Sequence, residues 1–157
     1  FVYNKKKLIK ERKMGQEEEK YLEDTVKDAI VPYWALLGIT PDLNTIEKGK
    51  VTLLLPMKEE LGTRFTDVMH GGAISSLIDA AAATCTSTLK PQDEEWAGWV
   101  TTDLNVSYLN AATKDVRAVA TSIRSGKTVV YVQVDVFDSD ERFIASGRVT
   151  YLILRPR

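Results

Sequence analysis

The chain is poor in the residues that disulfides, metal sites and membrane spans require. Its 157 residues include one cysteine, Cys85, which excludes an intramolecular disulfide, and one histidine, His70. No group of cysteine, histidine and carboxylate residues has the spacing of a metal site, so we expect no metal. No apolar run approaches the roughly 20 residues of a membrane-spanning helix, so we expect no membrane partner.

The chain also lacks a surplus of charge of one sign. The net charge is -1, which gives no reason to expect a nucleic-acid partner. Basic residues are concentrated near the start, and we expect residues 1–16 to form a mobile basic leader to a single domain at 17–157. The lone cysteine fits a reducing compartment, which predicts a cytoplasmic protein.

Hydrophobic periodicity predicts an α+β domain. The predicted helices span residues 17–37, where Pro32 kinks or divides the helix, and the alanine-rich stretch 72–89. The β-branched and aliphatic content predicts strands at 50–57, 98–109, 115–124, 127–138 and 142–154, with an irregular connection over 58–69. Short links join the last four strands and favour a meander of antiparallel neighbours. The order predicts one sheet packed on one long helix.

The predicted long helix has an apolar side and a side of small residues. The apolar side, which we expect to face the sheet, consists of Ile74, Leu77, Ile78, Ala81, Cys85 and Thr88. Asp79 lies on the other side, among Ser75, Ser76, Ala82, Ala83 and Thr86. Because a solvated helix face normally carries long charged side chains, we expect a second subunit to pack against these small residues.

Residues 70–79 contain the chemistry-bearing part of the chain. Two glycines, Gly71 and Gly72, follow His70 and let the backbone approach a ligand closely. The start of a helix presents unpaired N–H groups that can hold a developing oxyanion. Asp79 follows nine residues after the histidine and is the candidate base or nucleophile. A thioester suits this set, since a thiolate leaves without a strong general acid.

The run from His70 to Asp79 resembles the signature of the hotdog-fold acyl-CoA thioesterases, specifically of their phenylacetate-pathway (PaaI-like) branch, and the resemblance extends over about residues 33–154. It implies an antiparallel sheet wrapped around one long central helix, with an additional N-terminal helix. It also implies hydrolysis of an acyl-CoA, with no cofactor beyond the CoA of the substrate. The expected assembly is a homodimer or homotetramer in which the His-Gly-Gly loop of one chain faces the aspartate of another.

The resemblance also implies catalytic roles for individual residues. The N–H of Gly71 would hold the oxyanion, with Gly72 beside it, and His70 would bond the thioester oxygen or brace the loop. Thr101 would orient the attacking water. Strand alternation predicts that Thr101 shares a face with Asp103 and Asn105.

Further residues are implied to bind substrate. Arg124 and Lys127, at the hairpin before the predicted strand 127–138, would hold the phosphates of CoA. Tyr108 would line the same groove, and Gly72 would lie close to the bound substrate. The chain departs from many relatives six residues before the histidine, where Arg64 replaces an asparagine. Either the loop binds the substrate differently, or Arg64 contacts a phosphate or carboxylate.

Two other functions stay open. A hotdog hydratase or dehydratase pairs a catalytic histidine with a carboxylate in a different signature, and the single histidine is already part of His-Gly-Gly. A non-catalytic acyl-CoA-binding hotdog protein keeps the groove without turnover, and Arg64 is the feature that favours it. A Cys85–His70 nucleophile pair is disfavoured because Cys85 lies on the apolar side of its helix.

Overall fold

The computed structural model describes residues 2–28 and 31–157, with side chains from residue 15 onward. Its helices and strands follow one another as α1 (Val2–Asp28), α2 (Pro32–Leu37), β1 (Thr40–Pro41), β2 (Lys50–Leu55), α3 (Gly71–Ser87), β3 (Gly98–Tyr108), β4 (Val116–Ser125), β5 (Val129–Asp138) and β6 (Phe143–Leu154). Two short 3-10 helices lie at Leu43–Thr45 and Glu59–Leu61. The predicted strands and the long helix are confirmed to within a few residues, and β1 is an addition.

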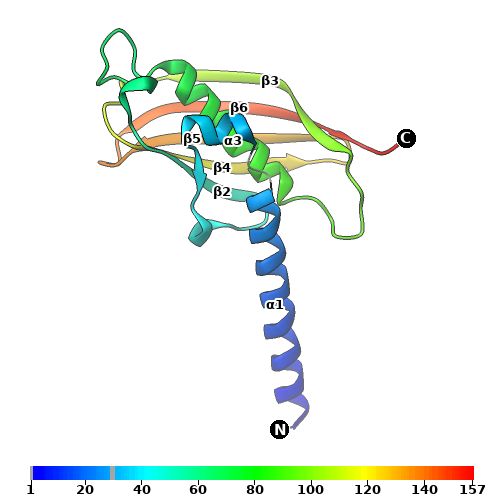
Figure 1. The fold of residues 1–157 in the computed structure, drawn as a ribbon. Coiled ribbons are helices and arrows are strands. Elements are labelled where there is room, and N and C mark those ends of the chain that lie inside the picture. Colours follow the sequence, from blue (N-terminus) through cyan, green and yellow to red (C-terminus); the bar gives the residue numbers. More distant parts are fainter. Residues whose placement is uncertain (1, 29–30) are drawn as a thin grey trace.

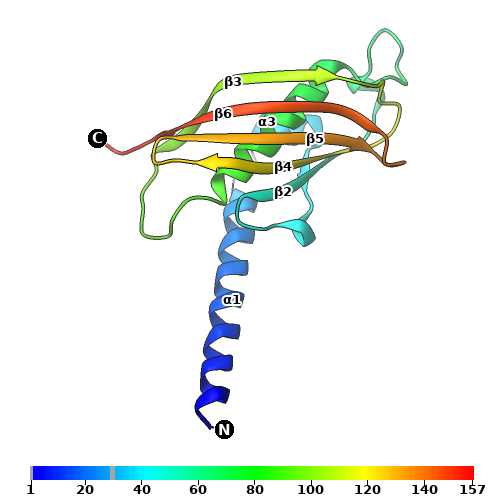
Figure 2. The same cartoon turned by 180° about the vertical axis from the view of Figure 1, so that it is seen from behind.

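The strands form one antiparallel sheet in the order β1-β2-β4-β5-β6-β3. Helix α3 lies across one face of this sheet, while the other face is open (Figures 1 and 2). One wrapped sheet on one long helix, preceded by N-terminal helices, is the hotdog arrangement, and the predicted fold class is therefore confirmed. No helix in the described part of the chain is long and apolar enough to cross a membrane.

The predicted meander is wrong for β3. This strand pairs with β6, at the edge of the sheet, and not with β4, which follows it in the chain. The link between β3 and β4 crosses the end of β6, because the amides of Leu109 and Asn110 both donate to the carbonyl of Ile144, at 2.9 and 3.1 Å. Ala112 in the same link is fully buried, and its carbonyl accepts from the amide of Met69 at 2.8 Å. This crossover link, residues 109–115, is only slightly longer than a hairpin loop, so the length of the link could not distinguish a crossover from a hairpin.

The core lies between α3 and the sheet. Residues Ile74, Leu77, Ile78, Ala81, Cys85 and Thr88, predicted to face the sheet, are all buried. The backbone of β6 comes close to α3 at Gly147, where an added Cβ would lie 2.7 Å from Cγ2 of Ile78. Glycine at this position thus allows the helix and sheet to approach.

Buried hydroxyls near the end of α3 are satisfied by the backbone of the same helix. The hydroxyls of Thr84 and Thr86 donate to the carbonyls of Ala80 and Ala82, both at 2.9 Å. Each bond returns one turn back along the helix, which lets a polar side chain be buried without loss of a hydrogen bond. The small polar residues on this side of α3 are therefore compatible with the core.

The predicted helix 17–37 is divided, as Pro32 allowed. Its first part belongs to α1, residues 29 and 30 lie outside the described residues, and Pro32 begins α2. Gly38 ends α2 with a left-handed φ of 85°, which glycine adopts without strain. Residues 2–16, predicted as a leader, continue α1, which projects away from the sheet (Figure 1). Their mobility stays a prediction.

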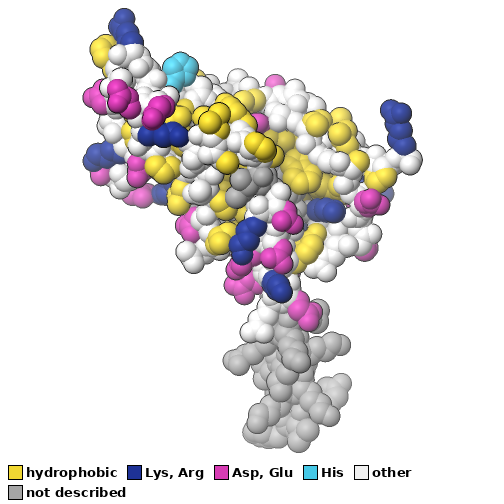
Figure 3. Space-filling view, in the orientation of Figure 1, with side chains coloured by type: hydrophobic (Ala, Val, Ile, Leu, Met, Phe, Trp, Pro, Cys, Tyr) yellow, Lys and Arg dark blue, Asp and Glu magenta, His cyan; other side chains and the backbone are white. Residues whose placement is uncertain are grey.

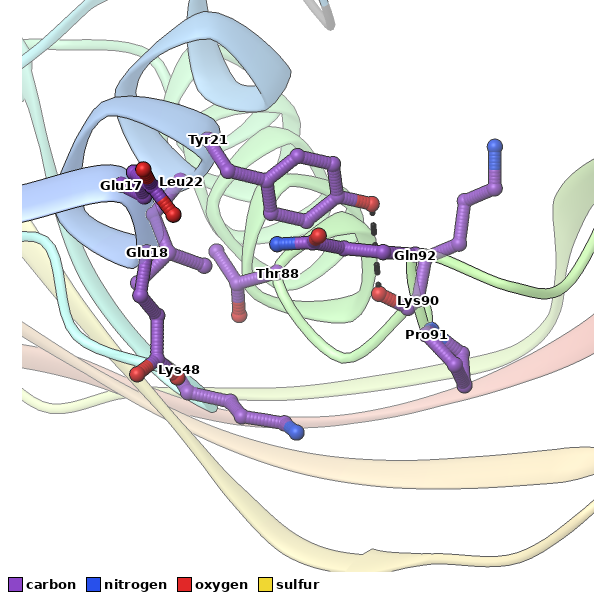
Figure 4. Close-up of a pocket in the computed structure, with 9 residues that line it drawn as sticks. All are labelled: Glu17, Glu18, Tyr21, Leu22, Lys48, Thr88, Lys90, Pro91 and Gln92. Atoms are coloured by element: carbon purple, nitrogen blue, oxygen red, sulfur yellow. Dashed lines mark hydrogen bonds between the residues drawn. The ribbon is translucent and has the colours of Figure 1, made fainter. Parts of the chain in front are cut away.

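The chain itself covers part of the small-residue side of α3. Both α1 and α2 contact α3, and Ala82 and Thr86 are fully buried within the single chain. Near this contact, Tyr21 of α1 donates to the carbonyl of Lys90 at 3.3 Å, beside a cavity of about 270 Å³ (Figure 4). The N-terminal helices therefore supply part of the cover, and the packing of a second subunit on this side stays a prediction.

Candidate active site

Asp79 is held by two hydroxyl groups from neighbouring strands. Its Oδ1 accepts from the Thr101 hydroxyl of β3 at 2.8 Å and from the Tyr151 phenol of β6 at 2.7 Å. The phenol also lies 3.0 Å from the Asp79 carbonyl. No donor among the side chains and amides that the structure describes reaches the second carboxylate oxygen, Oδ2. Asp79 thus has one anchored oxygen and one available for chemistry.

The phenol of Tyr151 is a donor and not an acid at neutral pH. Its side chain is 2% exposed, and burial, followed by the charge of Asp79, raises the pKa of Tyr151 far above its usual value. A neutral phenol can donate one hydrogen bond, and the Asp79 carboxylate accepts it. The bond is therefore charge-assisted, which makes it stronger than one between neutral groups.

Asp79 lines a largely apolar cavity of about 400 Å³. The remaining walls come from α2, α3, β3 and β6, and consist of Val31, Trp34, Ala83, Gly98, Trp99, Val100, Thr101 and Tyr151. Among these described residues Asp79 alone is charged. Trp99 is braced edge-to-face by Trp96, with ring centroids 6.2 Å apart. The cavity has the size and composition of a site for a small apolar group beside a carboxylate.

A bulge in β3 changes the predicted alternation. The register with β6 shifts between Thr101 and Asp103, so Thr102 is an extra residue in the strand. Thr101 lies opposite Tyr151 and faces α3, whereas Asp103 lies opposite Thr150 on the outer face. The prediction that Thr101, Asp103 and Asn105 share one face is therefore wrong, because the bulge reverses the alternation after Thr101.

The start of α3 offers one free backbone donor. His70 is the N-cap residue, and its Nδ1 accepts from the N–H of Gly72 at 2.8 Å. The N–H of Gly71 has no acceptor among the described residues. Of the two amides predicted to hold an oxyanion, Gly72 is thus engaged by the cap and Gly71 is available.

Tyr108 supports the same helix start. Its hydroxyl donates to the carbonyl of Gly71 at 3.0 Å and forms a short hydrogen bond with the Ser75 hydroxyl. A Cβ added at Gly71 would lie 3.2 Å from the Tyr108 ring, a close contact. Tyr108 therefore lies at the start of α3, in one group with His70, Gly71 and Gly72.

The structure places the predicted site residues in two groups within one chain. Asp79 and Thr101 form one group, and the helix start with Tyr108 forms the other. Gly71 and Asp79 are eight residues apart on α3, which corresponds to about 12 Å along a helix. The amide of Gly71 and the carboxylate of Asp79 would have to contact the oxygen and the carbon of one thioester carbonyl, which are joined by a single short bond. The two groups of one chain are too far apart to do so.

The predicted basic residues lie elsewhere on the surface. Arg124 and Lys127 are exposed at the β4–β5 hairpin, and the Lys127 carbonyl accepts from Arg155 at 2.9 Å. Arg155 follows β6, whose last residues pair with the first residues of β3, so the hairpin is at the Trp99 end of the sheet and not at the Tyr108 end. Arg64 is exposed in the loop before α3 and lies over the Phe65 ring, 4.9 Å from its centroid.

Cys85 is fully buried in the core, and burial raises the pKa of its thiol from 9.0 to about 12. We predict that the native thiol reacts with the reagent DTNB about a thousandfold more slowly than the thiol of the unfolded chain, because both access and the thiolate fraction fall. Absorbance of the released chromophore measures this, with the chain in guanidinium as the control that gives one thiol. Rapid native labelling that also abolishes activity would instead indicate a cysteine nucleophile.

The sequence reasoning missed Tyr151 and Trp99. Tyr151 lies between Val149 and Ile153 in a strand whose alternation places all three on the core face. A tyrosine on a core face needs a partner for its hydroxyl, and this was the available signal. Trp99 gave no comparable signal, since a tryptophan at the start of a strand is common in cores.

Comparisons with known proteins match most of the chain. The description of the thioesterase superfamily matches residues 66–145, which include the helix start, Asp79 and Thr101. The chain is 30% identical over 138 residues to the medium/long-chain acyl-CoA thioesterase YigI of Salmonella typhimurium, and the match covers 78% of this chain and 86% of YigI.

Solved structures share the fold. A thioesterase family protein from Silicibacter pomeroyi superposes with a TM-score of 0.77 at 24% identity, covering 86% of this chain and 99% of that one. The conserved protein PA5202 of Pseudomonas aeruginosa gives a TM-score of 0.72 at 29% identity, covering 82% and 98%. These names do not include the phenylacetate-pathway branch, which stays a prediction.

Proposed function

The chain belongs to the thioesterase superfamily, and from this premise we propose that it hydrolyses acyl-CoA thioesters to free acid and CoA, with Asp79 as base or nucleophile. The observation that carries the proposal is the Asp79 carboxylate at the wall of an apolar cavity, with one oxygen anchored by two hydroxyls and the other available. The name of YigI, an acyl-CoA thioesterase, supports CoA as the thiol of the substrate.

The chemistry needs few groups. Oδ2 of Asp79 either removes a proton from the water that attacks the thioester carbon, or attacks that carbon itself. In the second case the acyl group forms an anhydride with Asp79, and water then hydrolyses this anhydride to the free acid and the carboxylate. The N–H of Gly71, at the positive end of α3, stabilises the oxyanion that forms. CoA then leaves as a thiolate, which needs no strong acid. Thr101 orients the attacking water in this proposal. Its hydroxyl donates to Oδ1 of Asp79, which leaves the hydroxyl oxygen to accept a hydrogen bond from that water.

The site in this proposal is built from two copies of the chain. Gly71 of one copy approaches Asp79 of the other, because the two residues are about 12 Å apart along α3 of a single chain. Exposed apolar side chains support association, among them Leu104 and Tyr108 on β3 and Tyr33 and Leu36 on α2. Figure 3 shows hydrophobic side chains on the side of the molecule that carries α3. The outer edge of β3 has no strand partner in the described part of the chain, and such edges favour pairing. We therefore propose a dimer, or a tetramer of two dimers.

The acyl group in this proposal enters the cavity beside Trp34 and Trp99, since its walls are apolar. The phosphates of CoA lie toward the basic hairpin, where Arg124 and Lys127 are exposed. In this proposal Gly72 lies close to the bound substrate, and the exposed Arg64 in the loop before α3 contacts a phosphate or carboxylate. No carboxylate in the described part of the chain forms a hydrogen bond or an ion pair with His70, which argues against a hydratase that would use such a pair.

A panel of acyl-CoAs tests the proposal. Thiol release from hexanoyl-, dodecanoyl- and phenylacetyl-CoA should exceed release from acetyl-CoA by about tenfold or more in kcat/KM, because a buried methylene contributes about 0.8 kcal/mol. Acetyl-CoA is the matched control, since it shares every group except the apolar chain. Equal values across the panel would mean that the cavity does not hold the acyl group. Calorimetric binding without release would favour the non-catalytic alternative.

A further inference from the structure

We infer that Tyr151 is a positioning residue for Asp79, holding Oδ1 of the carboxylate so that Oδ2 is the oxygen that meets water or the thioester. The inference rests on the proposed function, because it assigns Asp79 the reacting oxygen. It extends that function to a residue of β6 that lies outside the residues matched by the superfamily description, 66–145.

The position of Tyr151 is set by the sheet. Thr101 and Tyr151 are directly opposite in the antiparallel register of β3 and β6. Side chains of opposite residues share a face and lie close together, so both hydroxyls reach one carboxylate oxygen. The bulge at Thr102 lies just after this pair and leaves it intact. Two rigid strands therefore fix the orientation of one side chain on α3.

Packing alone does not account for the tyrosine. Its neighbours on the core face of β6, Val149 and Ile153, are buried apolar residues, and a phenylalanine would fill the same space. The phenol oxygen contacts the carboxylate at 2.7 Å and the carbonyl at 3.0 Å, both of Asp79. The hydroxyl thus has one residue as its partner, and that residue is the proposed reacting group.

The electrostatic surroundings keep the bond in place. The residues around Asp79 are Val31 just before α2, Trp34 from α2, Ala83 from α3, Gly98, Trp99, Val100 and Thr101 from β3, and Tyr151 from β6. Among these described residues Tyr151 is the only other titratable group. Because its phenol stays protonated at neutral pH, it donates throughout the working range and does not compete as a base.

Tyr151→Phe removes the donor and keeps the ring. We expect kcat to fall about 10- to 100-fold, the range for a charge-assisted hydrogen bond, while KM changes by less than about threefold. The acid limb of the pH profile of kcat/KM should also move to higher pH, because the charged form of the carboxylate has lost a donor. A residue that only supports the fold would lower thermal stability without moving this limb.

The matched control is Tyr131→Phe, which removes an exposed phenol from the outer face of the adjacent strand β5. It should leave kcat, KM and the acid limb unchanged. Asp79→Asn is measured in parallel, so that the proposed role of Asp79 and the positioning role of Tyr151 are tested separately. If Asp79→Asn hydrolyses at the wild-type rate, the proposed role of Asp79 falls and the inference with it, because another group then performs the reaction. If Asp79→Asn is inactive while Tyr151→Phe keeps the wild-type kcat and acid limb, the inference alone is overturned.

A measurement on the unmodified Tyr151 covers the case in which Tyr151→Phe does not fold. With tyrosine labelled by ¹³C at Cζ, the Tyr151 resonance should show a step at the pH where Asp79 ionises, because the phenol donates to that carboxylate. The step should vanish in Asp79→Asn. A Tyr151 resonance without the step in the wild-type protein would overturn the inference.

Discussion

Asp79→Asn is expected to lower kcat/KM for the best acyl-CoA by about 10³-fold or more. The amide is nearly isosteric, and its oxygen still accepts from Thr101 and Tyr151, but it is neither a base nor a nucleophile. General base catalysis alone contributes about 10²- to 10⁴-fold, and loss of a covalent route would cost more. Initial rates of thiol release over a range of substrate concentrations measure the effect.

The control for this change is Asp103→Asn, which removes a carboxylate from the same sheet. Asp103 is exposed on β3 and lies opposite Thr150, on the face away from α3. It should retain wild-type kcat/KM, and both variants should unfold at temperatures close to the wild-type value. An Asp79→Asn protein within threefold of wild-type kcat/KM would show that another group performs the reaction.

Mixing two inactive variants should restore activity if two copies share each site. Asp79→Asn removes the carboxylate, and Gly71→Val places bulk at the amide that is proposed to hold the oxyanion, against the Tyr108 ring. In a mixed dimer one site carries both changes and the other carries neither. At equal concentrations half of the dimers are mixed, so about one quarter of wild-type activity should return after subunit exchange.

Subunit exchange itself needs an independent measurement, such as energy transfer between differently labelled chains. The matched control mixes Asp79→Asn with Thr101→Val, since both changes fall in the same group of residues and no site in a mixed dimer is then intact. At every mixing ratio, this mixture should show no more activity than the two variants show when they are assayed separately. Proven exchange without recovery in the first mixture would mean that each chain carries a complete site.

Local patterns were sufficient for most elements of the fold. The apolar side of α3, the strand lengths and the glycine pair at the start of the helix were all legible, since each depends on neighbours a few residues apart. The pairing of β3 with β6 was not legible, because the choice of strand neighbour depends on contacts between distant segments. The link at residues 109–115, of which only Ala112 is buried, carries the chain across the end of β6 and is only slightly longer than a hairpin loop.

The candidate site was predicted only as far as each residue's role could be tied to a local motif. Asp79 and Thr101 were named from the sequence, and the structure places their side chains 2.8 Å apart. One extra residue at Thr102 reversed the faces of Asp103 and Asn105, and alternation cannot detect such a bulge. Tyr151 is 72 positions from Asp79, so only the folded sheet brings its phenol to the carboxylate.

Incorporation of oxygen from water tests the central claim, hydrolysis of an acyl-CoA thioester, most directly. The wild-type chain is incubated with hexanoyl-CoA in H₂¹⁸O for many turnovers. Mass spectrometry then gives the amount of each product and the ¹⁸O content of the acid. The account predicts free CoA and hexanoic acid in equal amounts, with one ¹⁸O in each acid, and no products above background from Asp79→Asn. Intact hexanoyl-CoA bound to the wild-type chain, or an acyl product without ¹⁸O, would contradict it.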